Sequence, residues 1–206
     1  MKHRFIDPLL LPGTRLGPVD LLTRAVPLEG TPGQEYVERR GVPCAVATAA
    51  GVKFSADHAG RPAVLAGLRD LQGDLTAVHG RYLHNLRGQN KMLTVGRPGG
   101  VISIGARAGP LILVEGLFDA LSLAVCGQPA VATIGREVPW LVQTDRQILI
   151  AFDATRPGNE DAARLLALLP GSRRLLPPPR CKDWSTALAK RGALGVSRWL
   201  RDNLGW

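Results

Sequence analysis

The feature that most constrains the fold is a run of four apolar residues, LILV (111–114), that leads directly into Glu115 and Gly116. A continuous apolar run of this length is typical of a strand that is covered on both faces, as in a parallel sheet. LFDALSLAV (117–125) has the pattern of a helix, with Gly127 after it as a stop signal. The strand therefore ends on a carboxylate at the point where a helix begins.

Strand and helix patterns continue to alternate after this helix, which predicts an α/β fold with a parallel sheet and helices on both of its faces. Each predicted strand is a short apolar run, and glycine or proline marks most of the boundaries. We expect strands over 129–135, 147–152 and 172–177, a short helix over 138–144, and helices over 158–170, 184–190 and 193–203.

The first half of the chain has a different pattern, in which glycines separate four short strand-like segments, as in an antiparallel meander. These segments span 62–70, 73–83, 91–96 and 100–105. Residues 1–35 are rich in Pro, Gly and Leu and are expected to form an irregular arm, with a short helix over 33–41. We therefore expect an arm and short helix over 1–53 and a small α+β basic subdomain over 54–110.

The charge of the chain points to a polyanionic partner. With 26 Lys and Arg against 17 Asp and Glu, the net charge is +9, and nucleic acid is the usual partner of so basic a protein. No acidic residue occurs between Asp74 and Glu115, whereas Arg81, Lys91 and Arg97 lie in this interval. An alternative is that the high arginine content reflects the base composition of the genome.

Other features narrow the class of protein. Charges and glycines interrupt every apolar run before it reaches the length of a membrane span. The N-terminus lacks the full apolar region and the cleavage site of a signal peptide, so we expect a cytoplasmic protein with no membrane partner. The three cysteines, Cys44, Cys126 and Cys181, are widely spaced and fit neither a disulfide framework nor a zinc site.

Two carboxylates follow predicted strands directly, Glu115 after 111–114 and Asp153 after 147–152. Ligands of open α/β sheets bind at the carboxyl ends of the strands, so these two acids are expected to meet at one edge. Asp119 lies one helical turn beyond Glu115 and can point back to the same edge. Clustered carboxylates favour a divalent cation, most often Mg²⁺. The alternative is that Glu115 and Asp119 stabilise the N-terminus of the helix that they begin.

These motifs carry a resemblance to a known family. The segments VEGLFDALSL, AVATIG and IAFDATRPGNEDAARLL resemble, in this order, the TOPRIM domain that bacterial-type primases, topoisomerases and some nucleases share. The family has a Glu-Gly after its first strand and an Asp-x-Asp after a later one. CKDWSTAL (181–188) resembles a late Lys-Asp-Trp-Asn segment of phage and plasmid primase-like members. The resemblance implies a Rossmann-like TOPRIM domain over 111–190, followed by a C-terminal helix over 191–206.

Residues 54–110 are similar to the basic subdomain that precedes TOPRIM in primases, because they contain an Arg-Asp-x-x-Gly, a Gly-Arg and a following Lys. The resemblance implies that four basic residues bind nucleic-acid or nucleotide phosphate: Arg69, Arg81, Lys91 and Arg97. It implies that four acids hold Mg²⁺ or Mn²⁺: Glu115, Asp119, Asp153 and Asp183. It also implies that four residues are catalytic: Glu115, Asp153, Arg81 and Lys91.

The sequence departs from the family's pattern at three points. The Asp-x-Asp is Asp153-Ala154-Thr155 here, so a hydroxyl replaces the second acid and a weaker Mg²⁺ site is expected. No zinc-binding Cys/His module precedes the motifs, and no helicase or helicase-binding region follows them. We therefore expect a bare primase core, or one part of a larger system, of the kind found in a phage or another mobile element.

Three functions are compatible with these observations. The first is metal-dependent nucleotidyl transfer that makes short primers on single-stranded DNA or RNA from nucleoside triphosphates, with a replicative helicase or another replication protein as a partner. The second is a degenerate, non-catalytic module that binds nucleic acid in a mobile-element replication system, which Thr155 and the missing zinc module favour. The third is a TOPRIM nuclease, against which Thr155 and the upstream basic segment count. We expect the first.

Overall fold

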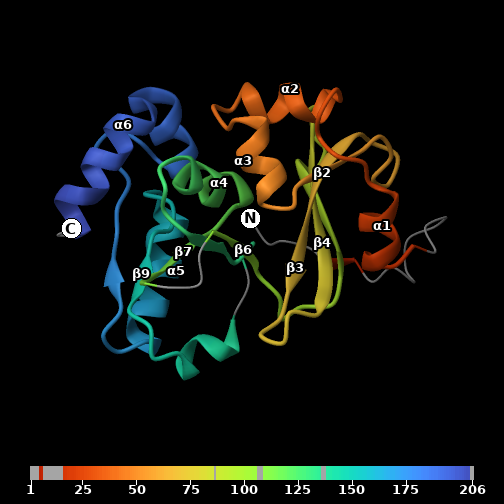
Figure 1. Cartoon of the computed structure of the whole chain (residues 1–206). Coiled ribbons are helices and arrows are strands. Elements are labelled where there is room, and N and C mark those ends of the chain that lie inside the picture. The colour runs from red at the N-terminus through yellow and green to blue at the C-terminus, as the bar shows by residue number, and fades with distance from the viewer. Residues whose placement is uncertain (1–4, 7–15, 86, 106–108, 136–137, 205–206) are drawn as a thin grey trace.

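Two five-stranded sheets stand side by side in the computed structural model, which describes residues 5–6, 16–85, 87–105, 109–135 and 138–204 (Figure 1). The first sheet has the strand order β1-β5-β4-β3-β2, and the second has the order β10-β9-β7-β8-β6. The chain builds the first sheet mainly from its N-terminal half and the second from its C-terminal half, as the change of sequence pattern predicts.

The first sheet contains the predicted antiparallel meander. Its strands are β1 (Phe5–Ile6), β2 (Lys53–Ser55), β3 (Ala63–Arg69), β4 (Leu75–Tyr82) and β5 (Met92–Gly96). β3, β4 and β5 pair antiparallel in sequence order, whereas β1 joins the sheet parallel to β5. Successive residues of β4 face opposite sides, so Ala77, His79 and Arg81 share the face that is turned towards the second sheet.

The fourth segment of the predicted meander belongs to the other sheet, so the prediction is wrong at this strand. β6 (Ile102–Ile104) pairs antiparallel with β8 (Ala130–Ala132) of the second sheet, and only Val101 bridges back to Arg69 of β3. The buried side chains of Ile102 and Ile104 explain the choice, because they pack in the apolar core next to the second sheet. A three-residue strand between glycines does not specify its partner by pattern alone.

The second sheet confirms the predicted α/β fold. It contains β7 (Leu111–Val114), β8, β9 (Ile148–Ile150) and β10 (Arg173–Arg174) in parallel, with β6 antiparallel at its edge. Ile112 and Val114 of β7 face a core shared with two helices, α4 (Leu117–Val125) and α6 (Trp184–Leu204). Leu111 and Leu113 face the opposite core, beneath α5 (Arg156–Leu168). Both faces of β7 are therefore buried, as its unbroken apolar sequence predicts.

Two further predictions about helices hold in this half. A 3₁₀ helix, η2 (Pro139–Gln143), occupies the predicted short helix over 138–144. α6 is interrupted at Gly192, where the backbone has φ 65° and ψ 172°, so it consists of the two predicted helical segments. Only glycine adopts this conformation without strain, which explains why the break falls there. Within the described residues, no helix is long and apolar enough to cross a membrane.

The N-terminal region is more ordered than its composition suggests. α1 (Pro18–Arg24) lies within the predicted irregular arm, so that prediction is wrong for these residues, while residues 1–4 and 7–15 of the arm lie outside the described residues. α2 (Pro32–Glu38) confirms the predicted short helix, and α3 (Cys44–Ala49) was not predicted. α1 packs Leu21 against the outer face of the first sheet, a tertiary contact that a short proline-rich sequence does not reveal.

Candidate active site

The carboxyl ends of β7 and β9 bring two predicted site residues together. The two strands are parallel neighbours, with Leu113 opposite Ile150. Glu115 follows β7 directly, and its Oε1 atom accepts a hydrogen bond of 3.1 Å from the backbone N–H of Asp153. The structure therefore places Glu115 and Asp153 at the same edge of the sheet, where the sequence predicted that they would meet.

The start of α6 docks on this edge and brings a third acid. The Nε1–H of Trp184, a fully buried side chain, donates to the carbonyl of Ala151 at 2.8 Å. The backbone N–H of Ala154 donates to the carbonyl of Lys182 at 2.7 Å. Between these two anchors lies Asp183, whose Oδ1 accepts from the N–H of Thr186 in the first turn of the helix. Asp183 is thereby fixed beside the other acids.

Asp119 joins the cluster from α4. Its Oδ1 accepts a hydrogen bond of 3.1 Å from the backbone N–H of Ser185, so it links α4 to the start of α6. The N-terminus of α4, at Gly116, has no side-chain hydrogen-bond cap. The bond to Ser185 lies outside α4, so a role confined to the N-terminus of its own helix does not account for Asp119, although its charge lies near that terminus.

Two of the four acids, Asp119 and Asp153, have a raised pKa. Burial, reinforced by the charges of Asp183 and Glu115, raises the pKa of Asp119 to about 7. Burial and the three neighbouring carboxylates likewise raise the pKa of Asp153 to about 8. The positive charge of Lys182 lowers the pKa of Asp153, but by less than burial and the neighbouring carboxylates raise it. Added positive charge would stabilise the ionised forms.

The N-terminus of α5 packs tightly against the same edge. A Cβ atom at Gly158 would lie 2.7 Å from Oε1 of Glu115 and 2.4 Å from the carbonyl oxygen of Asp153, so only glycine fits. Thr155, which replaces the family's second acid, caps this helix, because its Oγ1 accepts the N–H of Gly158 at 3.3 Å. Thr155 is not among the residues that line the cavity described next.

A cavity of about 440 Å³ lies between the two sheets at this edge, and we call it the acidic pocket. The C-terminal half of the chain contributes four carboxylates to its lining, from the second sheet and the helices that pack on it: Glu115, Asp119, Asp153 and Asp183. The first sheet contributes Arg81 of β4 and Lys91, which precedes β5. Six of the eight distinct positions that were predicted as site residues therefore line one pocket.

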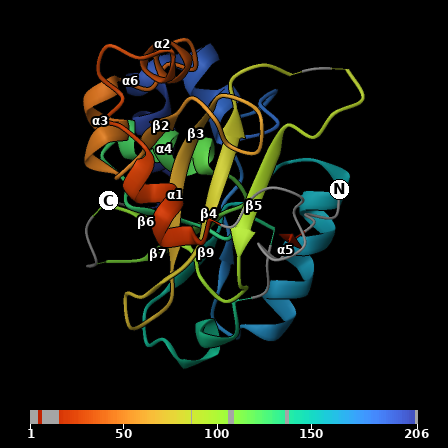
Figure 2. The same cartoon turned by 90° about the vertical axis from the view of Figure 1, so that its right-hand side faces the viewer.

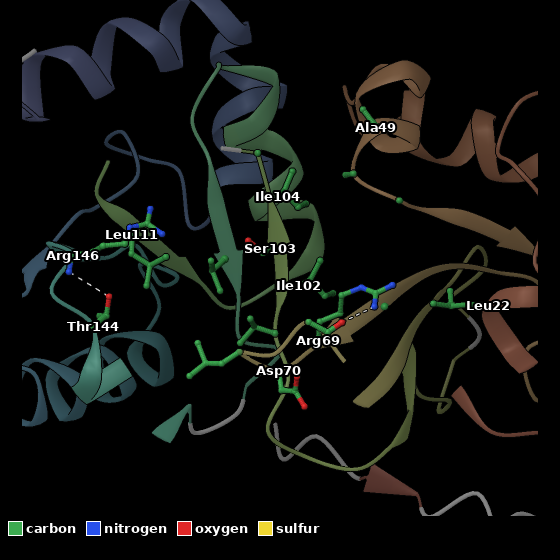
Figure 3. A pocket seen from close by; sticks show the side chains of 18 of the residues that line it. Leu22, Ala49, Arg69, Asp70, Ile102, Ser103, Ile104, Leu111, Thr144 and Arg146 are labelled. Atoms are coloured by element: carbon green, nitrogen blue, oxygen red, sulfur yellow. Dashed lines mark hydrogen bonds between the residues drawn. The ribbon is translucent and has the colours of Figure 1, made fainter. Parts of the chain in front are cut away.

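Arg69 and Arg97, the other two predicted phosphate-binding residues, lie elsewhere. Arg69 lines a larger cavity of about 770 Å³ beside β6, at the end of β7 opposite to the acids, and its guanidinium donates to the carbonyl of Gly73 (Figure 3). Arg97 forms an exposed ion pair with Asp70 at 3.4 Å. Neither side chain is placed to act with the four carboxylates.

Sequence reasoning missed Arg40, which also lines the acidic pocket. Its guanidinium carbon lies 4.3 Å from the ring centroid of Phe118 and 5.0 Å from that of Tyr36. The Oη of Tyr36 also accepts a hydrogen bond from Nε of Arg81 at 3.4 Å. Arg40 follows α2 and is one of two adjacent arginines in the sequence, so nothing local distinguishes it from a surface residue.

Arg174 of β10 is a second residue that the sequence did not reveal. Its guanidinium donates to the carbonyls of Ile150 and Asp153 and to Oδ1 of Asn159, at 2.9–3.1 Å. Its positive charge also interacts with the carboxylates of Glu115 and Asp153. Arg174 thus supports the backbone that carries Asp153 from behind the acidic pocket.

The donor set of the pocket suits Mg²⁺ or Mn²⁺, which prefer carboxylate oxygens. In the described part of the chain, no group of three or more His, Cys, Asp or Glu side chains is arranged so that it could hold a metal ion. Protein-bound Mg²⁺ commonly takes only one or two carboxylates and completes its shell with water and substrate phosphates. Four carboxylates in a shared pocket, of which Asp119 and Asp153 have a raised pKa, fit this second arrangement.

Comparison with known families identifies the segment that carries the acids. Residues 112–188 match the Toprim-like family. This segment is a Toprim-like domain. Residues 18–99, which include the first sheet's meander and α1 to α3, match a domain of unknown function, DUF7146. No curated protein sequence matches the chain.

The fold of the chain is that of a primase catalytic core with a Toprim-like domain. The RNA polymerase domain of Mycobacterium tuberculosis primase DnaG matches with a TM-score of 0.68 and 14% identity, over 88% of this chain and 80% of that one. A DnaG primase catalytic domain bound to ssDNA matches with 0.66 and 18%, over 90% and 77%. The primase fragment of the bacteriophage T7 primase-helicase protein matches with 0.60 and 20%, over 79% and 72%. Identities this low support the fold alone. The chemistry has to be argued from the residues of the site.

Proposed function

We propose that this protein catalyses primase-like nucleotidyl transfer, the synthesis of short primers on a single-stranded template. One observation carries the proposal: four carboxylates of the Toprim-like domain and basic side chains of the first sheet line a single pocket of about 440 Å³. Primer synthesis needs such a pairing, because the triphosphate must be bound and the charge that develops during transfer must be neutralised.

The carboxylates form the acidic wall of the pocket. Glu115 and Asp153, supported by Asp119 and Asp183, would hold Mg²⁺ or Mn²⁺ together with the nucleotide's phosphates. A divalent cation at this position supplies charge neutralisation for the phosphates and the attacking hydroxyl. The hydrogen bond from the backbone N–H of Asp153 and the packing of Gly158 hold Glu115 in one orientation.

The basic residues form the other side. Arg81 and Lys91 face the carboxylates across the acidic pocket and would contact nucleotide or template phosphate. Arg40 would act with them, because stacking on Phe118 and Tyr36 restricts its guanidinium and leaves its N–H groups available to an anion. Arg69 and Arg97 are proposed only as outlying contacts to nucleic acid.

The structures that share this fold also support a proposal for the template and the partners. One structure with this fold is a primase domain bound to ssDNA, and another comes from a primase-helicase protein. We therefore propose single-stranded DNA or RNA as template, nucleoside triphosphates as substrates, and a replicative helicase or another replication protein as partner. A cytoplasmic location and a phage or other mobile-element origin are proposed with it.

Primer synthesis tests the proposal directly. The protein is incubated with single-stranded DNA or RNA, labelled ribo- or deoxynucleoside triphosphates, and Mg²⁺ or Mn²⁺, and the products are separated by length. We expect short products that depend on template and metal and that disappear in Glu115→Gln, which keeps the size of the side chain and removes its charge. Products that persist in Glu115→Gln would contradict the proposal.

A second candidate is a non-catalytic Toprim-like module that binds nucleic acid. Thr155 favours it, because the residue in the place of the family's second acid caps α5 and does not line the acidic pocket. In that case the wild-type protein binds single-stranded nucleic acid without forming product in any metal, and Glu115→Gln leaves the affinity unchanged. A nuclease would instead shorten the labelled template in the same assay.

A further inference from the structure

The connection between β4 and β5 carries two residues to the acidic pocket, although it extends beyond the edge of the first sheet (Figure 2). Asn85 lies on its first half, and Lys91 lies at its end. Both are exposed, so neither is held in place by burial. Their position at the pocket therefore requires another source of order.

Arg61 supplies contacts at the base of this connection. Its Nη2 donates to the carbonyl of His84 at 2.6 Å, and its Nη1 donates to the carbonyl of Asn90 at 2.9 Å. The guanidinium carbon lies 3.9 Å from the ring centroid of Tyr82, the last residue of β4. One planar cation thus joins the two sides of the connection and stacks on the strand that it leaves.

The contacts occur where the strand ladder stops. The ladder of β4 and β5 pairs Arg81 with Met92, and the N–H of Tyr82 then donates to the carbonyl of Lys91. Beyond that rung, the guanidinium of Arg61 bridges the carbonyls of His84 and Asn90, one on each side of the connection. His84 precedes Asn85 and Asn90 precedes Lys91, so each bridged carbonyl adjoins a residue of the pocket lining.

We infer that Arg61 is a positioning residue, which fixes the base of the β4–β5 connection so that Lys91 and Asn85 stay at the acidic pocket. Arg61 itself is not among the residues that line the pocket. A guanidinium can bridge two carbonyls with parallel N–H groups and stack on a ring at the same time, whereas a lysine ammonium cannot. The inference rests on the proposed function only in taking phosphate as the ligand of Lys91.

Hydrogen exchange tests the structural part without any ligand. Arg61→Lys keeps the charge and loses the planar fork, Arg61→Ala loses both, and Arg201→Ala removes one exposed charge from the C-terminal part of α6 as a matched control. We expect exchange of the hydrogen-bonded backbone amides of Tyr82 and Leu83, at the base of the connection, to rise about three- to tenfold in both Arg61 variants, with the rest of the first sheet unchanged. Wild-type exchange in Arg61→Lys would overturn the inference, because it would show that charge alone suffices.

A double-mutant cycle tests the link to Lys91. The probe is a fluorescent single-stranded oligothymidylate, with Lys91→Ala, Arg61→Lys and the double variant compared by affinity. If Arg61 acts through Lys91, each single variant weakens binding about three- to tenfold and the double variant is no weaker than Lys91→Ala. Additive losses would overturn the link, because Arg61 would then contact the strand by itself. If Lys91→Ala binds like wild type, the proposed role of Lys91 fails, and the exchange result still decides whether Arg61 fixes the connection.

Discussion

At the scale of single residues, Thr155 is the clearest departure of the site from the Toprim pattern. It replaces the carboxylate that the Toprim family places after Asp153, and its hydroxyl caps α5 through the N–H of Gly158. Aspartate and asparagine are also good N-cap residues, so both fit this position without loss of the cap. The site can therefore be given its missing charge without disturbing the helix.

Thr155→Asp should raise the affinity for Mg²⁺ about tenfold and increase any primer synthesis, because it adds a negative charge two residues from Asp153, beside the acidic pocket. Thr155→Asn is the matched control, since it preserves the cap and adds no charge, and it should behave like wild type. Calorimetric titration of Mg²⁺ into each protein measures the difference. Equal affinities for Mg²⁺ in the two variants would show that a charge at this position does not affect metal binding.

Asp119 makes a prediction about pH. Its pKa of about 7 is above that of an unfolded aspartate, near 4, so the folded protein holds an extra proton between these values. The resulting stability is present at low pH and is lost as pH rises through about 7. Asp119→Asn removes this loss and can still accept the N–H of Ser185. In EDTA at pH 8, the free energy of unfolding of the variant should exceed that of wild type by about 1 kcal/mol. Its Tm should be higher by about 2–4 °C.

The difference in Tm between Asp119→Asn and wild type should narrow as pH is lowered to 5, and it should shrink at pH 8 when Mg²⁺ is added to the wild-type protein. Scanning calorimetry across this pH range measures both trends. A difference that is the same at every pH would mean that the variant acts by packing and that the carboxyl does not titrate as described.

At the scale of elements, the entry into α6 matters most, because it carries Asp183 to the sheet edge. The sequence pattern predicted both helical segments of α6, and the resemblance to primase-like proteins implied the acid before them. It did not predict how the helix docks. That depends on the indole of Trp184 meeting the carbonyl of Ala151, a contact between residues far apart in the chain.

Trp184→Phe should lower the free energy of unfolding by about 1–3 kcal/mol, because it leaves the buried carbonyl of Ala151 without its donor. Trp199→Phe is the control on the same helix: it removes an equivalent bond, to the carbonyl of Leu176, at a site that water reaches. Its loss should be smaller. Urea denaturation of the three proteins gives the comparison, and equal losses would contradict the proposed role of the buried bond.

At the scale of the whole molecule, the two walls of the acidic pocket are held together because the two sheets share one core. Val64 and Leu68 of the first sheet belong to the same apolar cluster as Ile112 of the second and Leu121 of α4. Carboxylates and basic side chains are thus held at a fixed spacing by packing on both sides of the pocket. Glu115 and Asp153 were predictable, because parallel strands deliver their carboxyl ends to one edge.

The basic wall was only partly predictable. Arg81 and Lys91 were recognised by motif, whereas Arg40 reaches the pocket through stacking on Phe118, a residue of the other half of the chain. The pairing of β6 with the second sheet has the same cause, because burial of Ile102 and Ile104 decides it. Both depend on tertiary contacts that a local pattern does not contain.

The distribution of charge gives a prediction for nucleic-acid binding. If Lys91 contacts one template phosphate, Lys91→Gln should reduce the dependence of log affinity on log salt concentration by about 0.7 for a single strand. Arg201→Ala, an exposed arginine of α6, should leave the slope unchanged. Fluorescence anisotropy with an oligothymidylate at several salt concentrations measures both, and an unchanged slope in Lys91→Gln would remove this residue from the interface.

The central claim is that the acids and the basic residues act on one ligand in one pocket. Calorimetric titration of a nucleoside triphosphate, with and without Mg²⁺, tests it in wild type, Glu115→Gln and Lys91→Gln. We predict that Mg²⁺ strengthens binding in the wild type, that Glu115→Gln loses most of this gain, and that Lys91→Gln weakens binding in both conditions. Triphosphate affinity that ignores Mg²⁺ and both substitutions would contradict the account.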